Sequence, residues 1–358
     1  MSIFQGSETS QPHIALFPSA GMGHLTPFLR LASMLLSHNC MVTLITTKST
    51  VSVAESTYIS FFLSTHPEIK HIEFQVPPMQ PSNTTTDDPF FIQFKATNRS
   101  AHLIHPLISS LSPPLSAIFS DLVVASGVSK VAVDLGPLGT YELEKDQGQY
   151  LPWLNNQPAE SVVFVSFGSR TAMSKDQIKE LRHGLEKSEY RFLWILKTKT
   201  VDKDDTEDLE DLLSCSFLER TKNKGMVLKE WVNQQDILAH PAVGGFVNHC
   251  GWNLVMEAAQ RGIPMLAWPQ HGDQRANAEV LVKAGLGIWN RTWGWGGQRL
   301  VKTDGNQKRI SELMTDVKLK SRAKKVGEEA RQATGNGGSS IKTTMEVIES
   351  LKQNNRSR

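Results

Sequence analysis

The residues best suited to chemistry lie between Trp231 and Gln274, in the segment WVNQQDILAHPAVGGFVNHCGWNLVMEAAQRGIPMLAWPQHGDQ. Trp231 offers an aromatic plane on which a base can stack. The run His249–Asn253 follows an apolar strand and opens a helix, whose free N–H groups and positive dipole end suit a diphosphate. Glu257 lies one helical turn further on, where its carboxylate can accept two vicinal ribose hydroxyls. Asp273 and Gln274 follow the next strand and offer paired polar groups for sugar hydroxyls, so the segment contains what a nucleotide-sugar site needs.

A second pair of reactive residues lies in the first third of the chain. His24 belongs to a Gly-rich turn predicted over 19–27, after the first strand and at the edge where parallel α/β sheets bind ligands. A histidine titrating near neutrality can take a proton from an acceptor hydroxyl. Asp121 ends a later strand, where a carboxylate could orient the imidazole and stabilise its charged form. Taken alone, each residue is equally compatible with a site and with an ordinary surface position.

The elements that must position these residues are short apolar strands alternating with helical patterns, which indicates parallel α/β sheets. Ser174 and Gln177 predict a capping box for a helix running to about residue 187. The predicted fold class is α/β, with two Rossmann-like domains facing each other across a cleft. Strands are predicted at 13–17, 41–46, 72–76, 117–119, 161–167, 191–197, 225–230, 243–248 and 264–268, and helices at 28–38 and 316–333.

The length of 358 residues corresponds to about two domains at ~150 residues each. We expect an N-terminal acceptor-binding domain over 1–140 and a C-terminal sugar-donor domain over 141–358, whose last helix packs back on the N-terminal domain. A βαβ unit needs about 30 residues, yet the chain reaches a linker-like segment soon after Asp121. The N-terminal domain is therefore predicted to lack βα units near 122–128.

Composition excludes several classes of protein. Lys and Arg number 38 against 36 Asp and Glu, so the net charge of +2 gives no basis for nucleic-acid binding. Cys40, Cys215 and Cys250 are too scattered for a disulfide framework or a tetrahedral metal site. No run approaches the ~20 apolar residues of a membrane span, and the N-terminus lacks the features of a signal peptide. The expectation is a cytoplasmic monomer without a metal ion.

The segment 231–274 closely resembles the signature box of plant UDP-dependent glycosyltransferases of family 1, which have the GT-B fold. Trp231 or His249 alone would more often be an ordinary packing or strand-end residue, but their occurrence together in register favours a site. The positions that match at the family's spacing are Trp231, Gln234, His240, Gly245, Phe246, His249, Cys250, Gly251, Trp252, Asn253, Glu257, Gly262, Pro264, Pro269, Asp273, Gln274 and Asn277.

The resemblance implies that UDP-glucose is a co-substrate and that no cofactor is needed. It implies a uracil stacked on Trp231 beside Gln234, and a ribose held by Glu257. The remaining implied donor contacts are Ser169, His249 and Asn253 at the phosphates, and Trp252, Asp273 and Gln274 at the sugar, with Gln274 favouring glucose over galactose. One departure is Leu254, where the family usually has a serine whose hydroxyl is available to phosphate.

The same resemblance implies that His24 is the catalytic base and Asp121 its partner. Asp88-Pro89-Phe90 is similar to the DPF motif of plant C-glucosyltransferases that act on flavonoid precursors. This implies that Asp88 and Phe90 bind the acceptor, with Asp88 helping to form or orient a phenolate. A lone Asp-Pro is otherwise usually a turn.

The expected function is therefore that of an inverting UDP-glucosyltransferase acting on a plant phenolic acceptor. C-glucosylation of a 2-hydroxyflavanone or a dihydrochalcone is the first interpretation. In it, the deprotonated phenol attacks the anomeric carbon from the face opposite UDP, and the helix end with His249 stabilises the departing diphosphate. The alternatives are O-glucosylation of a flavonoid by the same pair, or an inactive, truncated chain that only binds the donor.

Overall fold

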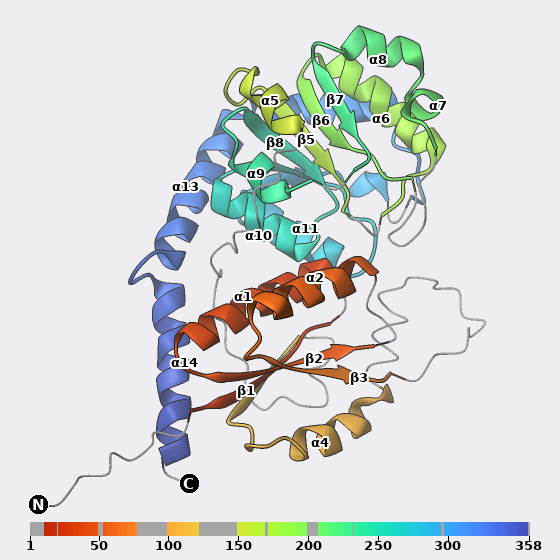
Figure 1. The fold of residues 1–358 in the computed structure, drawn as a ribbon. Helices are drawn as coiled ribbons and strands as arrows, with labels where there is room; N and C mark the ends of the chain where they lie inside the picture. The colour runs from red at the N-terminus through yellow and green to blue at the C-terminus, as the bar shows by residue number, and fades with distance from the viewer. Residues whose placement is uncertain are drawn as a thin grey trace, which may run out of the picture. The chain divides into compact units, whose positions relative to one another are not determined.

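The computed structural model describes residues 11–19, 21–48, 53–76, 99–121, 149–168, 171–198, 207–230, 232–294 and 297–356. The chain divides into two compact units (Figure 1). Unit 1 is Met1–Gly139 together with Gln332–Arg358, and unit 2 is Thr140–Arg331. Both ends of the chain thus belong to unit 1.

Unit 1 is built on a parallel sheet with the strand order β3-β2-β1-β4. All five residues of β1 are buried, because the strand lies inside the sheet, whereas the residues of the outer strand β4 are half-buried. Its last helix, α14, buries Ser340, Thr344 and Ile348, which lie on one helical face. The elements are β1 (His13–Phe17), α1 (Met22–Ser37), β2 (Met41–Thr47), α2 (Val53–Thr65), β3 (Lys70–Phe74), α4 (Ala101–Ser109), β4 (Ala117–Ser120) and α14 (Ser339–Arg356).

The start of α1 differs from the sequence prediction. The Gly-rich turn predicted over 19–27 is much shorter, since the helix begins at Met22 and contains Pro27. Gly and Pro disfavour a helix locally, which is why the pattern indicated a turn. The first turns nevertheless bury Leu25 and Leu29, and tertiary burial of an apolar face outweighs local propensity.

Unit 2 is built on a second parallel sheet, with the order β10-β9-β8-β5-β6-β7. Counted from β5, this is the doubly wound Rossmann order. Its strands are β5 (Val162–Ser166), β6 (Arg191–Ile195), β7 (Gly225–Leu228), β8 (Val243–Asn248), β9 (Met265–Ala267) and β10 (Gly287–Trp289). Its helices are α5 (Tyr150–Asn155), α6 (Lys175–Ser188), α7 (Leu209–Leu213), α8 (Cys215–Thr221), α9 (Gln234–Ala239), α10 (Trp252–Arg261), α11 (Gln274–Lys283), the 3-10 turn η2 (Arg291–Trp293), α12 (Thr303–Thr315) and α13 (Val317–Thr334), which runs on into unit 1.

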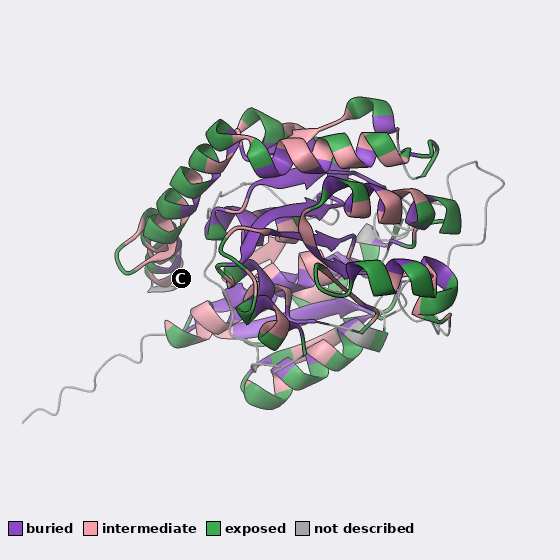
Figure 2. Cartoon of the chain, turned by 90° about the horizontal axis from the view of Figure 1, so that it is seen from above, coloured by how far each residue is buried: buried purple, intermediate pink, exposed green. Residues whose placement is uncertain are grey.

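Both faces of the unit 2 sheet are buried (Figure 2). Alternate residues of β5 enter two different core clusters: Val162 and Phe164 lie in one, Val163 and Val165 in the other. The Phe164 ring stacks on Phe246 of β8 with 4.8 Å between the ring centroids. A strand covered on both faces reads as an unbroken apolar run, which is why the sequence predicted it well.

The capping box predicted at the start of α6 is only half formed. The Ser174 hydroxyl accepts a hydrogen bond from the backbone N–H of Gln177 at 3.2 Å, as expected of an N-cap. The Gln177 side chain, however, does not return to Ser174. It bonds the backbone of Val301, accepting from its N–H at 2.8 Å and donating to its carbonyl at 3.0 Å. The Gln177 side chain therefore bonds a segment distant in the sequence and not the N-cap residue that the local pattern predicted.

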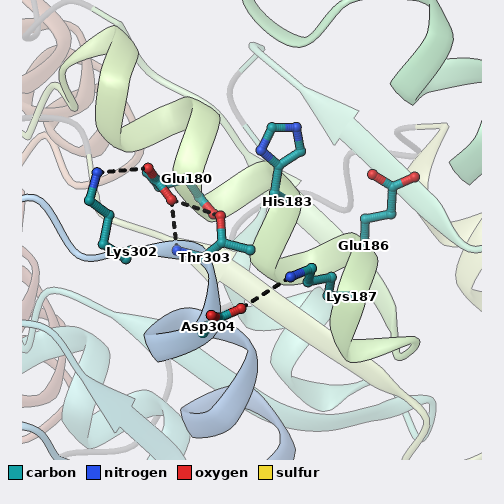
Figure 3. A pocket seen from close by; sticks show the side chains of 7 residues that line it. All are labelled: Glu180, His183, Glu186, Lys187, Lys302, Thr303 and Asp304. Atoms are coloured by element: carbon teal, nitrogen blue, oxygen red, sulfur yellow. Dashed lines mark hydrogen bonds and ion pairs between the residues drawn. The ribbon is translucent and has the colours of Figure 1, made fainter.

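Glu180 of α6 ties that helix to the start of α12 (Figure 3). Its carboxylate accepts from the backbone N–H and the hydroxyl of Thr303, both at 2.7 Å, and from Lys302 at 3.2 Å. The bonds from Thr303, followed by Lys302, lower the pKa of Glu180 from 4.5 to about 2. The surface hollow around this carboxylate is also lined by His183, Glu186, Lys187 and Asp304, and Lys187 pairs with Asp304 at 3.1 Å.

We expect the replacement Glu180→Gln to destabilise unit 2 in a pH-dependent way. The pKa of Glu180 is lower in the folded than in the unfolded state, so its contribution is complete above about pH 4.5 and is lost as the pH falls towards 2. Allowing for solvent screening, we expect about 1–2 kcal/mol at pH 7, or a Tm lowered by about 2–6 °C. Thermal unfolding from pH 7 to 3 should show the two Tm values converging below pH 4.5.

The matched control for this prediction is Glu219→Gln. Glu219 forms an ion pair with Lys222 whose side chains are largely exposed, so its removal should leave the Tm unchanged. A Tm difference for Glu180→Gln that stayed constant from pH 7 to 3 would contradict the assignment.

Candidate active site

Each sheet reverses its strand order at one point, and these points hold the candidate residues. In unit 1 the reversal lies between β1 and β4, and in unit 2 between β5 and β8. Open α/β sheets bind ligands outside the carboxyl ends of the strands at such a point. His24 and Asp121 follow β1 and β4, and Gly168 and the segment 249–251 follow β5 and β8.

His24 and Asp121 are hydrogen-bonded to each other, with 2.6 Å between Nδ1 and Oδ2. The backbone brings the two side chains together, because β4 runs parallel to β1 and the N–H of Asp121 donates to the carbonyl of Phe17 at 3.2 Å. The side chain of His24 is 28% exposed and that of Asp121 is 13% exposed. With the Nδ1 proton held by the carboxylate, the neutral ring carries its acceptor lone pair on Nε2, which is the arrangement of a general base.

The His249 ring is packed between two glycines. A Cβ added at Gly168 would stand 2.7 Å from its Cε1, and one added at Gly251 would stand 2.8 Å from its Nε2. Burial, followed by the nearby His271, lowers the pKa of His249 to about 3. Its Nδ1 is buried and has no hydrogen-bond partner in the described part of the chain. His249 is thus a neutral imidazole at pH 7, and can offer a ring N–H to an anion.

The turn around Cys250 brings the chain from β8 into α10. Cys250 has φ 63°, in the left-handed region, and its N–H donates to the Asn248 side chain at 2.8 Å. The Asn277 amide donates to the Cys250 carbonyl at 3.0 Å and to Asp273 Oδ2 at 2.9 Å. Burial raises the pKa of the Cys250 thiol to about 12, so at neutral pH it is an un-ionised packing group and not a nucleophile.

The buried carboxylate of Glu257, on α10, is held by three side-chain amides. Its Oε1 accepts from Asn253 at 2.8 Å and from Gln235 at 3.2 Å. Its Oε2 accepts from Gln234 at 2.9 Å. These donors come from the first turn of α9 and the first turn of α10, so two helix starts converge on one acceptor group. Gln235 was not predicted from the sequence; the only signal was a second amide beside Gln234.

Asp273 and Gln274 lie at the start of α11, after β9. The Gln274 side-chain oxygen accepts from the backbone N–H groups of Gln270 and His271 at 2.8 and 3.0 Å, and its nitrogen lies 3.2 Å from His271 Nδ1. Gln274 is buried. Its amide therefore holds the loop after β9 in one shape.

Trp252 and Leu254 share the first turn of α10 but differ in exposure. Trp252 is 43% exposed, although it is a large aromatic residue, so its ring is accessible to a ligand. Leu254 is half-buried and packs against the core of unit 2. The side chain that stands where the resembling family has a serine thus stabilises the helix by apolar contact.

Four predicted site residues lie outside the described part of the chain: Asp88, Phe90, Ser169 and Trp231. The segment 122–128 also lies outside it. In the described residues no group of three or more His, Cys, Asp or Glu side chains is placed to hold a metal ion. None of the helices in the described ranges has the length and hydropathy to cross a bilayer.

Comparison with known proteins gives a consistent result. Residues 140–292 match the family model described as UDP-glucoronosyl and UDP-glucosyl transferase. UDP-glycosyltransferase 708G2 of Citrus unshiu is 38% identical over an alignment of 468 residues that covers 98% of each chain. UDP-glycosyltransferase CGT of Oryza sativa subsp. indica is 34% identical and covers 92% of this chain and 94% of its own.

Two solved structures show the same fold. The crystal structure of LpCGTa in complex with UDP superposes with a TM-score of 0.76 at 36% identity, covering 96% of this chain and 99% of the other. Medicago truncatula UGT71G1 complexed with UDP-glucose superposes with a TM-score of 0.78 at 23% identity, again covering 96% of this chain and 99% of the other. The Citrus alignment is 468 positions long against 358 residues here, so at least 110 positions of that relative have no counterpart.

Proposed function

Because this chain belongs to the family of UDP-glucoronosyl and UDP-glucosyl transferases, we propose that it transfers glucose from UDP-glucose to a phenolic acceptor with inversion at the anomeric carbon. It is a glycosyltransferase with the GT-B fold. The observation that carries the proposal is the hydrogen-bonded pair His24–Asp121 at the switch point of the unit 1 sheet.

The donor is assigned to the switch point of unit 2. Glu257 accepts the ribose hydroxyls, and the N-terminus of α10 with His249 and Asn253 binds the diphosphate. The neutral, buried ring of His249 supports this role, since it can donate a hydrogen bond without bringing a charge that must be desolvated. UDP is the ligand named for the LpCGTa structure and UDP-glucose for the Medicago structure.

The remaining donor contacts are assigned by the same resemblance. Trp231 stacks on uracil with Gln234 beside it, and Ser169 reaches the phosphates. Trp252, Asp273 and Gln274 bind the sugar. The exposed face of Trp252 supports its assignment, whereas the Gln274 amide is engaged by the loop after β9 and would have to exchange a bond to reach a hydroxyl.

The chemical step begins at Nε2 of His24, which takes the proton of the phenolic hydroxyl. Asp121 stabilises the imidazolium that forms. The phenolate carbon attacks the anomeric carbon from the face opposite UDP, while the bond from that carbon to the diphosphate oxygen breaks and its electrons leave with UDP. The proton on the attacked carbon then passes to water, the ring regains aromaticity, and the imidazolium of His24 returns its proton to the phenolate oxygen. The N–H groups at the start of α10 stabilise the charge that develops on UDP.

C-glucosylation of a 2-hydroxyflavanone or a dihydrochalcone is the reaction we favour. The Oryza sativa relative carries the name CGT, and Asp88-Pro89-Phe90 is similar to the motif of flavonoid C-glucosyltransferases, with Asp88 and Phe90 as acceptor contacts. O-glucosylation of a flavonoid by the same pair is the second candidate. A cytoplasmic, monomeric state stays a prediction from the sequence.

We further assign residues 1–140 to a shortened acceptor domain and 141–358 to the donor domain, with the last helix, α14, packing back on the acceptor domain; its residues are grouped with unit 1. The 110 or more positions of the Citrus relative that have no counterpart here support a shortened chain. A chain that binds the donor but lacks transferase activity is therefore the alternative to an active enzyme.

The decisive experiment is mass spectrometry of a reaction with UDP-glucose and phloretin, followed by acid treatment of the product. We expect a hexose adduct that survives acid, because a C–C glucosidic bond resists hydrolysis. An acid-labile adduct would establish the O-linked reaction instead. No adduct, with UDP still raising the Tm, would establish a donor-binding chain without transfer, and no response to UDP would overturn the donor assignment.

A further inference from the structure

Glu55 is a buried carboxyl group for which the reaction proposed above has no use. It lies in the first turn of α2 and is 1% exposed. Its Oε1 accepts a hydrogen bond from the backbone N–H of Gly21. Burying a carboxylate costs free energy unless its hydrogen bonds compensate. We therefore ask what the contact between α2 and the start of α1 does.

Gly21 is the residue from which α1 starts. It has φ 118° and ψ 133°, a backbone conformation that only glycine adopts without strain. Its carbonyl accepts from the N–H groups of His24 and Leu25, both at 2.9 Å, and so begins the helix. As a glycine, Gly21 has no side chain with which to cap this end. The carboxylate of Glu55 supplies the acceptor from a different helix, and a negative charge there suits the positive end of α1.

The position of Gly21 decides where the His24 ring lies, because His24 is in the first turn that the Gly21 carbonyl begins. The bond from Nδ1 to Asp121 Oδ2 is 2.6 Å long, and a hydrogen bond of this kind weakens steeply with misalignment. We propose that Glu55 is a positioning residue: it fixes Gly21 and thereby holds the imidazole of His24 in register with Asp121. The proposal rests on the proposed function for its catalytic consequence, but not for its structural one.

The test compares Glu55→Met with Glu55→Gln. Methionine has a similar length and no strong acceptor, so it leaves the Gly21 N–H without this partner, whereas glutamine keeps an acceptor oxygen. We expect Glu55→Met to lower kcat about 10- to 100-fold, the cost of a catalytic group displaced by about 1 Å. The KM for UDP-glucose should stay within about twofold. Glu55→Gln should recover most of the loss in kcat.

A control on the same helix separates positioning from loss of stability. Ile59 lies one turn along α2 and is 5% exposed, so Ile59→Ala removes core packing from the same helix but keeps the carboxyl group of Glu55. We expect its kcat to stay within about threefold of wild type although its Tm falls. An equal loss of kcat in Ile59→Ala and Glu55→Met would overturn the proposal, because the effect would then be one of helix stability.

Two further measurements test whether Glu55 acts on kcat through the bond between His24 and Asp121. In the Asp121→Ala background, Glu55→Met should cost little more, since residues that act through one bond are not additive; full additivity would overturn the proposal. Nitrogen-15 NMR of the imidazoles, assigned with a His24→Gln variant, should show the His24 Nδ1–H signal of the wild type lost in Glu55→Met. This readout needs no turnover: a chain without transferase activity refutes the proposed function, and an unchanged Nδ1 signal refutes the role of Glu55.

Discussion

The replacement His24→Ala should lower kcat for sugar transfer by about 10²–10⁴-fold, the range contributed by a general base. UDP binding should be unchanged, because the residues assigned to UDP lie in unit 2 whereas His24 lies in unit 1. The measurements are kcat with saturating UDP-glucose and acceptor, and the rise in Tm on adding UDP. Once the imidazole is removed, no other group takes its place beside Asp121. The remaining kcat should therefore show no pH dependence from a catalytic base.

The matched control is His38→Ala, at the opposite end of α1. It removes the same type of side chain from the residue that follows α1, and kcat should stay within about twofold of wild type. Asp121→Asn should fall between the two variants, since an amide can still contact the ring but cannot stabilise its charged form. Equal losses of transfer and of UDP binding in His24→Ala would mean that His24 supports the structure and is not the base.

Removing the carboxylate of Glu257 should have the second largest effect. Hydrogen bonds to a charged group contribute about 1.5–3 kcal/mol each, so losing two ribose hydroxyl contacts should weaken UDP binding by about 100-fold or more in Glu257→Ala. Calorimetry with UDP and with 2′,3′-dideoxy-UDP measures this. The dideoxy ligand should bind wild type and Glu257→Ala with about the same weak affinity, because it lacks the hydroxyls that Glu257 is proposed to hold.

The conservative variant Glu257→Gln is expected to be nearly as defective as Glu257→Ala. Three amide nitrogens, from Gln234, Gln235 and Asn253, donate hydrogen bonds to the carboxylate. The NH₂ group of a glutamine at this position is itself a donor, so it could not accept these hydrogen bonds. Glu279→Gln is the control, since Glu279 makes a surface ion pair with Arg291 on another part of unit 2. A Glu257→Gln variant that bound UDP like wild type would show that the amides do not need an anion.

The sheets could be predicted closely from the sequence because most of their strands are short apolar runs; β3, with the sequence KHIEF, is the exception. The nine predicted strands are present, and their bounds agree with the structure within two residues. The largest shift is in β3, observed at Lys70–Phe74 against 72–76, since Val76 is buried like a strand residue but lies beyond the ladder with β2. The three-residue strand β10 gave too short a pattern to be predicted.

Features set by distant contacts could not be predicted. Helix α1 begins at Met22, and its N-terminal residue Gly21 is bonded by Glu55, more than thirty residues away. The Gln177 side chain bonds the backbone of Val301 and not its predicted capping partner, because the backbone of Val301 approaches α6 only in the folded unit. The pair His24–Asp121 was identified by position in the chain, but its 2.6 Å geometry depends on β4 lying beside β1.

The division of unit 1 between the two ends of the chain has a consequence for its synthesis on the ribosome. Strands β1 to β4 are complete once Ser120 has been made, whereas α14, which belongs to the same unit, starts only at Ser339. At ~5–20 residues per second, the intervening segment takes on the order of ten seconds or more to synthesise. All of unit 2 is synthesised in that interval, so unit 2 can begin to fold before unit 1 is complete. Unit 1, which carries His24, is completed last, when α14 is made, so it stays incomplete and accessible to chaperones for longer than unit 2.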